Sequence, residues 1–246
     1  MKVFAFLLLV ASTLHAQVPE LITAGDALDQ QNRNSEALAL YIKADAKKPN
    51  DSEMLRRISN QYAQLMLDAT SSSERAELGR STLDAARRAV AADPNNARAH
   101  LSLAIVYGRI AFNEPPRRKI EMSRLIKQEA EIAARLDPKN DYAWHVLGRW
   151  NYEIANFNPV LKALAEAIYG KFPNASNEKA VECFQRAIVI QPRRVIHHLE
   201  LGRAYLALGE KQKAGDELNK GLSLPPIDKD DDDNKQRARA TLKQLK

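Results

Sequence analysis

Regularly spaced prolines constrain the fold of this chain more than any other feature. Four of them close Ala-rich amphipathic stretches: Pro49, Pro94, Pro138 and Pro192. Ten residues after each proline, inside the next amphipathic stretch, stands a small residue: Ser59, Ala104, Gly148 and Gly202. Because proline ends a helix and a small residue lets two helices approach closely, this spacing predicts helices packed in pairs.

The distance from a small residue to the next proline gives the period of the pattern. This distance is the same from Gly25 to Pro49 as from Gly202 to Pro226. Together with the step from proline to small residue, it makes a complete unit of about 34 residues, which is typical of the helix-turn-helix units of tetratricopeptide repeats. The sequence therefore predicts an all-α fold, a tetratricopeptide-like α-solenoid of five helix-turn-helix units with a C-terminal capping helix.

The repeat domain is expected at 17–228, followed by an acidic turn and the capping helix at 229–246. Its units are expected at about 18–51, 52–96, 97–140, 141–194 and 195–228. The three middle units have extra residues in the turn between their helices, at about 67–77, 110–119 and 155–175. We expect helix starts near Ser71 and after Pro115, and a further helix over 159–168.

Residues 1–16 have the pattern of a secretory signal peptide. Lys2 is basic, residues 3–14 are mostly apolar, and Ala16 is a small residue suited to cleavage. The apolar run is shorter than the roughly 20 residues that cross a membrane. We therefore expect cleavage and an exported, periplasmic or secreted protein. In the alternatives, residues 3–14 anchor the chain in a membrane, or the protein is cytoplasmic.

Tetratricopeptide-like repeats bind ligands on a concave surface lined by the first helix of each unit. Eight residues are predicted to face this groove: Arg56, Asn60, Arg98, Arg109, His145, Arg149, Tyr152 and Arg203. Because arginine binds carboxylates and phosphates in a bidentate manner, the groove suits an acidic peptide, a chain terminus or an anionic lipid head group. We expect it to be centred on Arg149 and Arg203. In the alternative, the same residues form a solvated face with local ion pairs.

Composition excludes some other functions. A formal net charge of +6 in 246 residues is too small to indicate nucleic-acid binding. The single Cys183 cannot form an internal disulfide, and we expect it to be a small buried residue. No catalytic constellation is apparent, so the sequence predicts a non-enzymatic protein without a cofactor.

Other conspicuous residues are interpreted as structural. We expect Trp144 in the core and Trp150 under the long fourth turn. His197 and His198 point about 100° apart on a helix and lack further ligands, so no metal site is predicted. The series Asp228, Asp230 and Asp232 resembles the start of a calcium loop, but Asp233 stands where glycine is required.

One segment resembles the regulator of microtubule dynamics family of tetratricopeptide proteins. The resemblance is carried by Asp137-Pro138, residues 143–150, Leu164-Ala165, residues 169–173, and Glu178-Lys179-Ala180 with Phe184. It implies a helical repeat fold without catalytic activity, association with microtubules and, in membrane-tethered members, lipid binding. Because a cleaved signal would remove the chain from the cytoplasm, we expect an exported, bacterial-type scaffold with a different, acidic partner; the alternative is a microtubule-associated or lipid-binding repeat protein.

Overall fold

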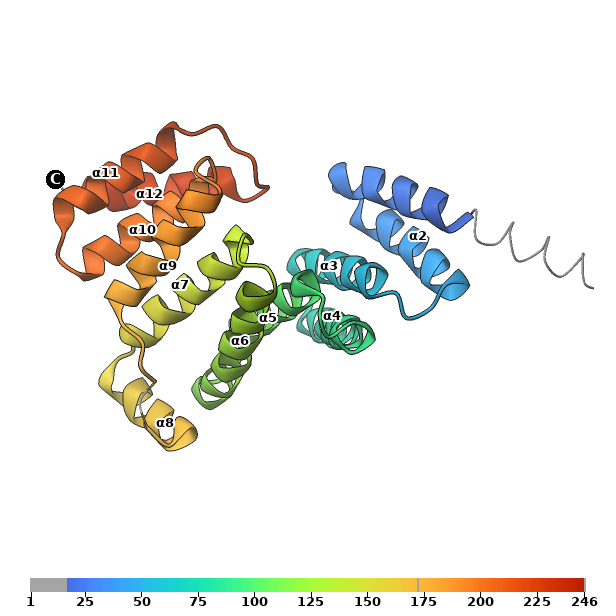
Figure 1. Ribbon diagram of the computed structural model, residues 1–246, viewed down its shortest axis with the longest axis horizontal. Helices are drawn as coiled ribbons and strands as arrows, with labels where there is room; N and C mark the ends of the chain where they lie inside the picture. The colour runs from blue at the N-terminus through green and yellow to red at the C-terminus, as the bar shows by residue number, and fades with distance from the viewer. Residues whose placement is uncertain (1–16, 172, 246) are drawn as a thin grey trace, which may run out of the picture. The chain divides into compact units, whose positions relative to one another are not determined.

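The computed structural model describes residues 17–171 and 173–245, and all regular secondary structure in this part of the chain is helical (Figure 1). The predicted signal peptide at 1–16 lies outside the described residues. A first helix occupies residues 17–30. It is followed by α2 (Asn34–Lys47), α3 (Ser52–Asp68), α4 (Ser72–Ala92), α5 (Ala97–Ala111), α6 (Pro116–Leu136), α7 (Asp141–Ala155), α8 (Pro159–Tyr169), α9 (Asn177–Ile190), α10 (Val195–Ala207), α11 (Lys211–Ser223) and α12 (Asp231–Leu245). The all-α prediction is confirmed.

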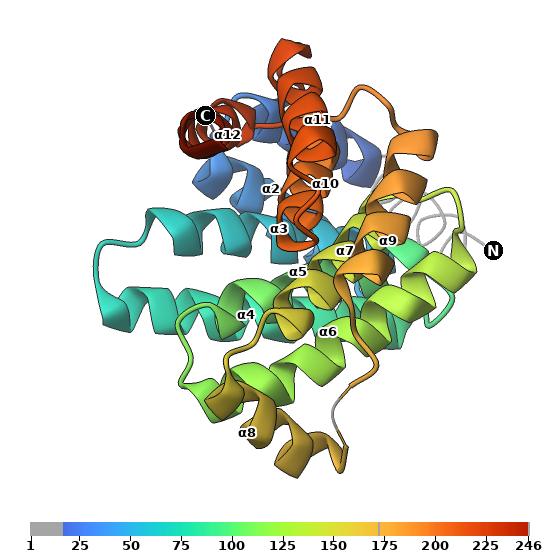
Figure 2. The ribbon, with the colours of Figure 1, turned by 90° about the vertical axis from the view of Figure 1, so that its left-hand side faces the viewer.

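The helices form two compact units, the first ending at Ile110 and the second beginning at Ala111. In the first unit, α3 packs against α2 and α4. In the second unit, α7 packs against α6 and α9, and α10 packs against α9, α11 and α12. Helix α8 contacts α6, beside which it lies in Figure 2. Each unit therefore has the sequential helix packing of a helical repeat.

The small residues ten positions after the prolines allow close packing between the two helices of a pair. A Cβ atom at Gly148 would lie 2.6 Å from Cε1 of Phe184, which is fully buried. A Cβ atom at Gly202 would lie 2.7 Å from Cγ of Leu218. Glycine at these positions thus lets α7 approach α9, and α10 approach α11, more closely than any larger residue would.

A second contact recurs at the joint between successive pairs. In three of the repeats, the residue six positions after the proline has a ring nitrogen that lies close to the carbonyl oxygen of that proline. The distances are 2.9 Å for His100 and Pro94, 3.0 Å for Trp144 and Pro138, and 2.9 Å for His198 and Pro192. After Pro49 the equivalent residue is Leu55, which is buried and has no ring nitrogen to make this contact. The ring nitrogen gives the proline carbonyl oxygen a hydrogen-bond partner. Carbonyl groups near the end of a helix need such partners, because no further turn of the helix supplies an N–H donor.

Local capping explains where the additional helices begin and end. The side chain of Ser71 accepts a hydrogen bond from the Glu74 amide at 3.1 Å, as expected for a helix start. Asn158 accepts one from the Leu161 amide at 2.9 Å, at the start of α8. Gly170 ends α8 with a φ of 83°, a backbone conformation that favours glycine. The helix expected over 159–168 is present.

The two tryptophans occupy different environments. Trp150 is buried, and its indole nitrogen donates to the carbonyl of Ser123 at 2.9 Å, in agreement with its predicted structural role. The expectation that Trp144 lies in the core is wrong: its ring is partly exposed, and the guanidinium of Arg186 lies 3.7 Å from its centroid. Its indole N–H donates to the Pro138 carbonyl at 3.0 Å, and the ring lies at the edge of the core beneath the Arg186 side chain.

Among the described residues, no helix combines the length and the hydrophobicity needed to cross a membrane.

Candidate binding surfaces

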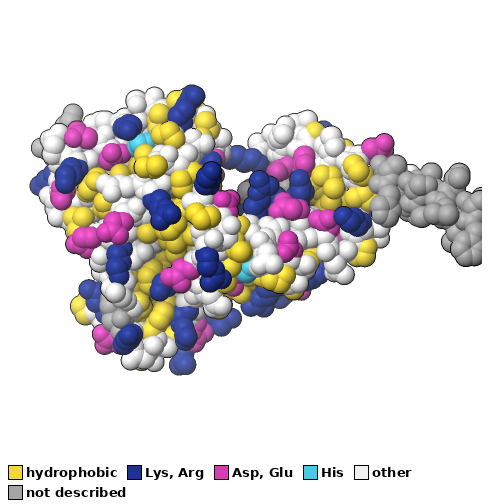
Figure 3. Space-filling view, in the orientation of Figure 1, with side chains coloured by type: hydrophobic (Ala, Val, Ile, Leu, Met, Phe, Trp, Pro, Cys, Tyr) yellow, Lys and Arg dark blue, Asp and Glu magenta, His cyan; other side chains and the backbone are white. Residues whose placement is uncertain are grey.

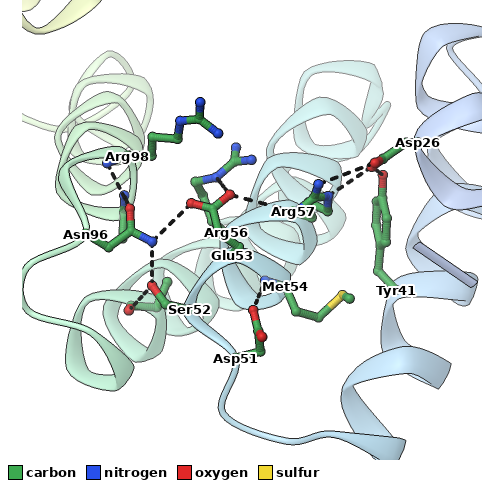
Figure 4. Close-up of polar contacts among 12 residues, drawn as sticks. Asp26, Tyr41, Asp51, Ser52, Glu53, Met54, Arg56, Arg57, Asn96 and Arg98 are labelled. Carbon is green, nitrogen blue, oxygen red and sulfur yellow. Dashed lines mark hydrogen bonds and ion pairs between the residues drawn. The ribbon is translucent and has the colours of Figure 1, made fainter. Parts of the chain in front are cut away.

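The first unit brings three of the predicted groove residues to neighbouring helices. Arg56 and Asn60 lie one turn apart on α3, and Arg98 lies in the first turn of α5. The hydroxyl of Ser102 on α5 donates to Asn60 Oδ1 at 3.1 Å, so the two helices are side by side at this point. We call Arg56, Asn60 and Arg98 the α3–α5 surface. Its side chains are labelled in Figure 4, except Asn60.

Glu53 is the anion that orders this surface. The amide nitrogen of Asn96 donates to its Oε1 at 3.0 Å, and Nε of Arg56 donates to its Oε2 at 3.1 Å. Burial opposes ionisation of Glu53, but the Asn96 bond and the charges of Arg56 and Arg98 outweigh it and lower the pKa of the carboxyl group. Glu53 is therefore a fixed negative charge that orients Arg56.

Arg98 differs from its neighbours because no carboxylate of the described residues lies within ion-pair distance of its guanidinium. Its backbone amide donates to Asn96 Oδ1 at 3.0 Å, which fixes the start of α5, and its side chain is exposed. Figure 4 shows its guanidinium extending toward the same side as that of Arg56. The Arg98 guanidinium is thus exposed beside that of Arg56, which is 19% exposed and paired with Glu53.

Arg57, the next residue on α3, lies with its Nη1 3.7 Å from Oε2 of Glu53, but its shorter bonds are to Asp26 on the first helix. It donates to both carboxylate oxygens of Asp26, at 2.9 and 3.3 Å, and Asp26 also accepts from the Tyr41 hydroxyl at 2.6 Å (Figure 4). Burial works against the ionised form of Asp26, yet these hydrogen bonds lower its pKa. The pairing fixes α3 against the first helix and leaves little capacity for a ligand.

In the second unit, Arg149 and Arg203 converge on one carboxylate, that of Glu200. Nη1 of Arg203 donates to both of its oxygens at 2.9 and 3.0 Å, and Nη1 of Arg149 lies 3.7 Å from Oε1. Arg149 also pairs with Glu153 at 3.3 Å, while the Arg203 guanidinium lies 4.9 Å from the ring centroid of Tyr152. Arg149 and Arg203, the predicted centre of the groove, therefore belong to an ion-pair cluster with Glu153 and Glu200.

His145 is buried, with 7 % of its surface exposed, and so does not line a groove. Its Nδ1 lies 3.0 Å from Nδ1 of His197, whose Nε2 lies 2.9 Å from the carboxylate of Asp141. Because Nε2 of His197 must donate to Asp141, its Nδ1 accepts from His145. Helical spacing in the sequence predicted that His145 faces the groove. Spacing does not report how a helix is rotated about its axis, and in the structure α7 is rotated so that His145 faces α10. Arg109 is partly buried on α5 and has interactions of its own.

The remaining conspicuous residues take part in structural contacts. His198 is fully buried, with Nδ1 2.7 Å from Glu217 and Nε2 at the Pro192 carbonyl. Asp228 accepts from Arg194 and from the hydroxyl of Tyr142. Cys183 is partly buried, and burial raises the pKa of its thiol to about 11, which suppresses the nucleophilic thiolate.

Residues 21–246 match the family described as Regulator of microtubule dynamics protein 1-3. The chain belongs to this family. Among relatives of the regulator of microtubule dynamics family, protein 2 of Mus musculus is 25% identical over 217 residues, which cover 88% of this chain and 53% of that protein. Protein 1 of Mus musculus is 28% identical over 225 residues, covering 90% and 73%. The chain thus spans about half the length of the type 2 relatives.

Solved structures show the same fold in other tetratricopeptide proteins. A thermophilic protein of Thermus thermophilus aligns with a TM-score of 0.64 at 19% identity, over 91% of this chain and 99% of that protein. YrrB, described as having an unusual peptide-binding site, aligns with a TM-score of 0.52 at 18% identity, over 95% and 99%. At these identities the likeness concerns the fold, and it confirms tetratricopeptide-like helix pairs in this member of the regulator of microtubule dynamics family.

Proposed function

We propose that this protein is a non-catalytic scaffold that binds an acidic segment of a partner protein through the α3–α5 surface. The observation that carries the proposal is the exposed guanidinium of Arg98, which has no carboxylate partner among the described residues and extends beside Arg56 (Figure 4). Membership of a regulator family and a tetratricopeptide-like fold support an interaction role in general.

The chemistry of the surface fits a carboxylate ligand. Arginine offers several N–H donors in a planar arrangement that matches a carboxylate, and such charge-assisted bonds are stronger than neutral ones. Glu53 holds Arg56 in one orientation, so this side chain loses less conformational freedom when a ligand binds. Asn60, one turn further along α3, adds an amide beside the arginine pair.

The test measures binding of a fluorescent Asp/Glu-rich peptide to the purified chain. Arg98→Glu is expected to weaken binding by about tenfold or more, since it replaces a charge-assisted bond with repulsion. Arg80→Glu is the matched control, because Arg80 is an exposed arginine elsewhere in the first unit, on α4. Equal affinities of the two variants would contradict the proposal. Added salt is expected to weaken wild-type binding.

The family match supports a second candidate, association with microtubules. Cosedimentation with polymerised microtubules tests it directly, and Arg98→Glu indicates whether the α3–α5 surface is responsible. If the wild-type chain binds the acidic peptide and stays in the supernatant with microtubules, the partner is another acidic protein. The cellular compartment of the protein, expected above to be outside the cytoplasm, would then direct the search.

A further inference from the structure

The second unit has a cavity over α7, with α6 on one side and α9 on the other. Helix α7 packs against both of these helices and lies between them in Figure 1. The cavity has a volume of about 300 Å³, at the lower end of the range of ligand sites in proteins. None of the eight predicted groove residues is among those that line it. The cavity is therefore a separate site, and its size suits a single side chain or a small molecule.

The floor of the cavity belongs to α7 and offers a hydrogen-bond acceptor. Leu147 and Trp150 line the floor with apolar surface and are themselves buried. Asn151 also lines it and is only 8% exposed, and its Nδ2 donates to the carbonyl of Leu147 at 2.9 Å. Its Oδ1 accepts no hydrogen bond from any of the described residues. A nearly buried amide oxygen without a donor favours a ligand that brings an N–H group.

The walls of the cavity contain two lysines, of which one is not compensated by a carboxylate. Lys127 on α6 lies 3.4 Å from Glu131, and its Nζ is 5.1 Å from the ring centroid of Trp150. Lys179, in the first turn of α9, is partly buried and donates to the carbonyl of Asn174 at 2.8 Å. No carboxylate of the described residues lies within ion-pair distance of Lys179. Figure 3 shows hydrophobic surface flanked by Lys and Arg side chains in the region of α6 and α7.

We infer that this cavity binds the C-terminal residue of a partner protein when that residue has an apolar side chain. Such a residue has three groups, and the cavity has a counterpart for each. The α-carboxylate pairs with the ammonium of Lys179, and the amide N–H donates to Oδ1 of Asn151. The apolar side chain covers the surface of Leu147 and Trp150 and removes it from water.

Two related ligands suit the cavity less well. A free amino acid has the same carboxylate and side chain, but its ammonium group would lose water against the neutral amide of Asn151, which is costly for a charge. An acidic C-terminal residue would bring a second negative charge close to Glu131 and Glu182, which also line the cavity. The preference for an apolar residue distinguishes this site from the α3–α5 surface.

The test measures, by fluorescence polarisation, how the full chain binds a labelled glycine- and serine-containing peptide that ends in leucine. The same peptide with a C-terminal amide is expected to bind about tenfold more weakly, because it lacks the carboxylate. Lys179→Gln, which retains a donor for Asn174, is expected to weaken binding of the carboxylate peptide to a similar degree. Lys220→Gln is the matched control, because Lys220 is an exposed lysine on α11 of the same unit. Circular dichroism verifies that both variants are folded.

Alkylation of Cys183 shows where the peptide binds. Cys183 lines the cavity and is the single cysteine of the chain, so its rate of reaction with N-ethylmaleimide reports on this site. The unlabelled leucine peptide, at saturation, is expected to slow the reaction about fivefold by restricting access to the thiol. Equal protection by free leucine would overturn binding of a chain end and assign the cavity to the free amino acid.

Four further results would each overturn the inference. They are absence of binding of the leucine peptide, equal affinities of its carboxylate and amide forms, equal affinities of Lys179→Gln and Lys220→Gln, and an unchanged rate of Cys183 alkylation. A peptide that ends in aspartate and binds as tightly as the leucine peptide would overturn the apolar preference. The comparison of carboxylate and amide peptides uses the wild-type chain, so it does not depend on the folding of any variant.

Discussion

Nε2 of His198 lies 2.9 Å from the carbonyl oxygen of Pro192, the proline that stands six residues earlier and separates α9 from α10. Nδ1 of the same ring lies 2.7 Å from Glu217 on α11. One fully buried side chain therefore connects the joint between two helix pairs with the helix that completes the second pair.

Replacing His198 with leucine tests this connection. Leu55 occupies the equivalent position six residues after Pro49, so an aliphatic side chain suits the backbone there. His198→Leu removes both contacts and leaves the Pro192 carbonyl and Glu217 without this partner, so we expect a loss of about 1–3 kcal/mol in the free energy of unfolding. Urea denaturation measures it. His198→Gln, which retains a donor, is expected to lose less; equal losses would show that the contacts contribute little.

Gly148→Ala tests the close approach of α7 and α9. Because the new methyl group would overlap the buried ring of Phe184, we expect a loss of about 1–3 kcal/mol in unfolding free energy. Gly215 on α11 is the control, since a Cβ atom there meets nothing within 4 Å. Gly215→Ala is expected to stabilise the protein by about 0.5–1 kcal/mol through helix propensity. Thermal denaturation of both variants should give shifts of opposite sign.

The buried pair of His145 and His197 predicts loss of stability in mild acid. Burial lowers the pKa of His145 well below its ordinary value, and the charge of His197 acts in the same direction. Burial also lowers the pKa of His197, against the opposing influence of Asp141. The unfolded chain therefore binds protons below about pH 6.5 that the folded chain does not, so stability falls as pH decreases through this range.

Urea denaturation between pH 7.5 and pH 5 measures this effect, with His145→Leu as the comparison. The variant is expected to show a smaller decrease, because one of the two histidines is absent. Asp141 contributes at lower pH: despite its burial, the His197 bond and the charge of Arg194 lower the pKa of its carboxyl group. Its contribution is present above about pH 4 and is lost below it. An identical decrease in the wild type and the variant between pH 7.5 and pH 5 would exclude His145 as a cause.

Simultaneous replacement of Arg149 and Arg203 by glutamate is expected to destabilise the second unit. The side chain of Glu200 is only 6% exposed and has both arginines as partners. With glutamate at both positions, the buried Glu200 carboxylate would have no positively charged partner. We expect a loss of about 1–3 kcal/mol in the free energy of unfolding. Differential scanning calorimetry detects the lower melting temperature, and Glu200→Gln in the same background should recover part of it. An unchanged melting temperature would instead indicate that these arginines are free for a ligand.

Sequence spacing was sufficient to predict the helix pairs, because proline and glycine act through local backbone geometry. The closeness of Gly148 to Phe184 agrees with that prediction. Site residues were harder to place, since the direction of a side chain depends on how far each helix rotates against its neighbour. His145 lies in the same helix as Arg149, one turn away, yet only His145 points to the interior. The pairing of Arg149 and Arg203 with Glu200 likewise depends on tertiary contacts that spacing does not report.

The ring-to-proline contact also has an evolutionary consequence. Both of its partners lie within one short stretch of the chain, so each repeat that has the contact contains everything needed to close its own joint. The turn between the two helices of a pair does not contain this contact. The extra residues of the three middle repeats lie in that turn. New segments such as α8 can therefore be acquired and altered in these turns without disturbing the register of the repeats on either side.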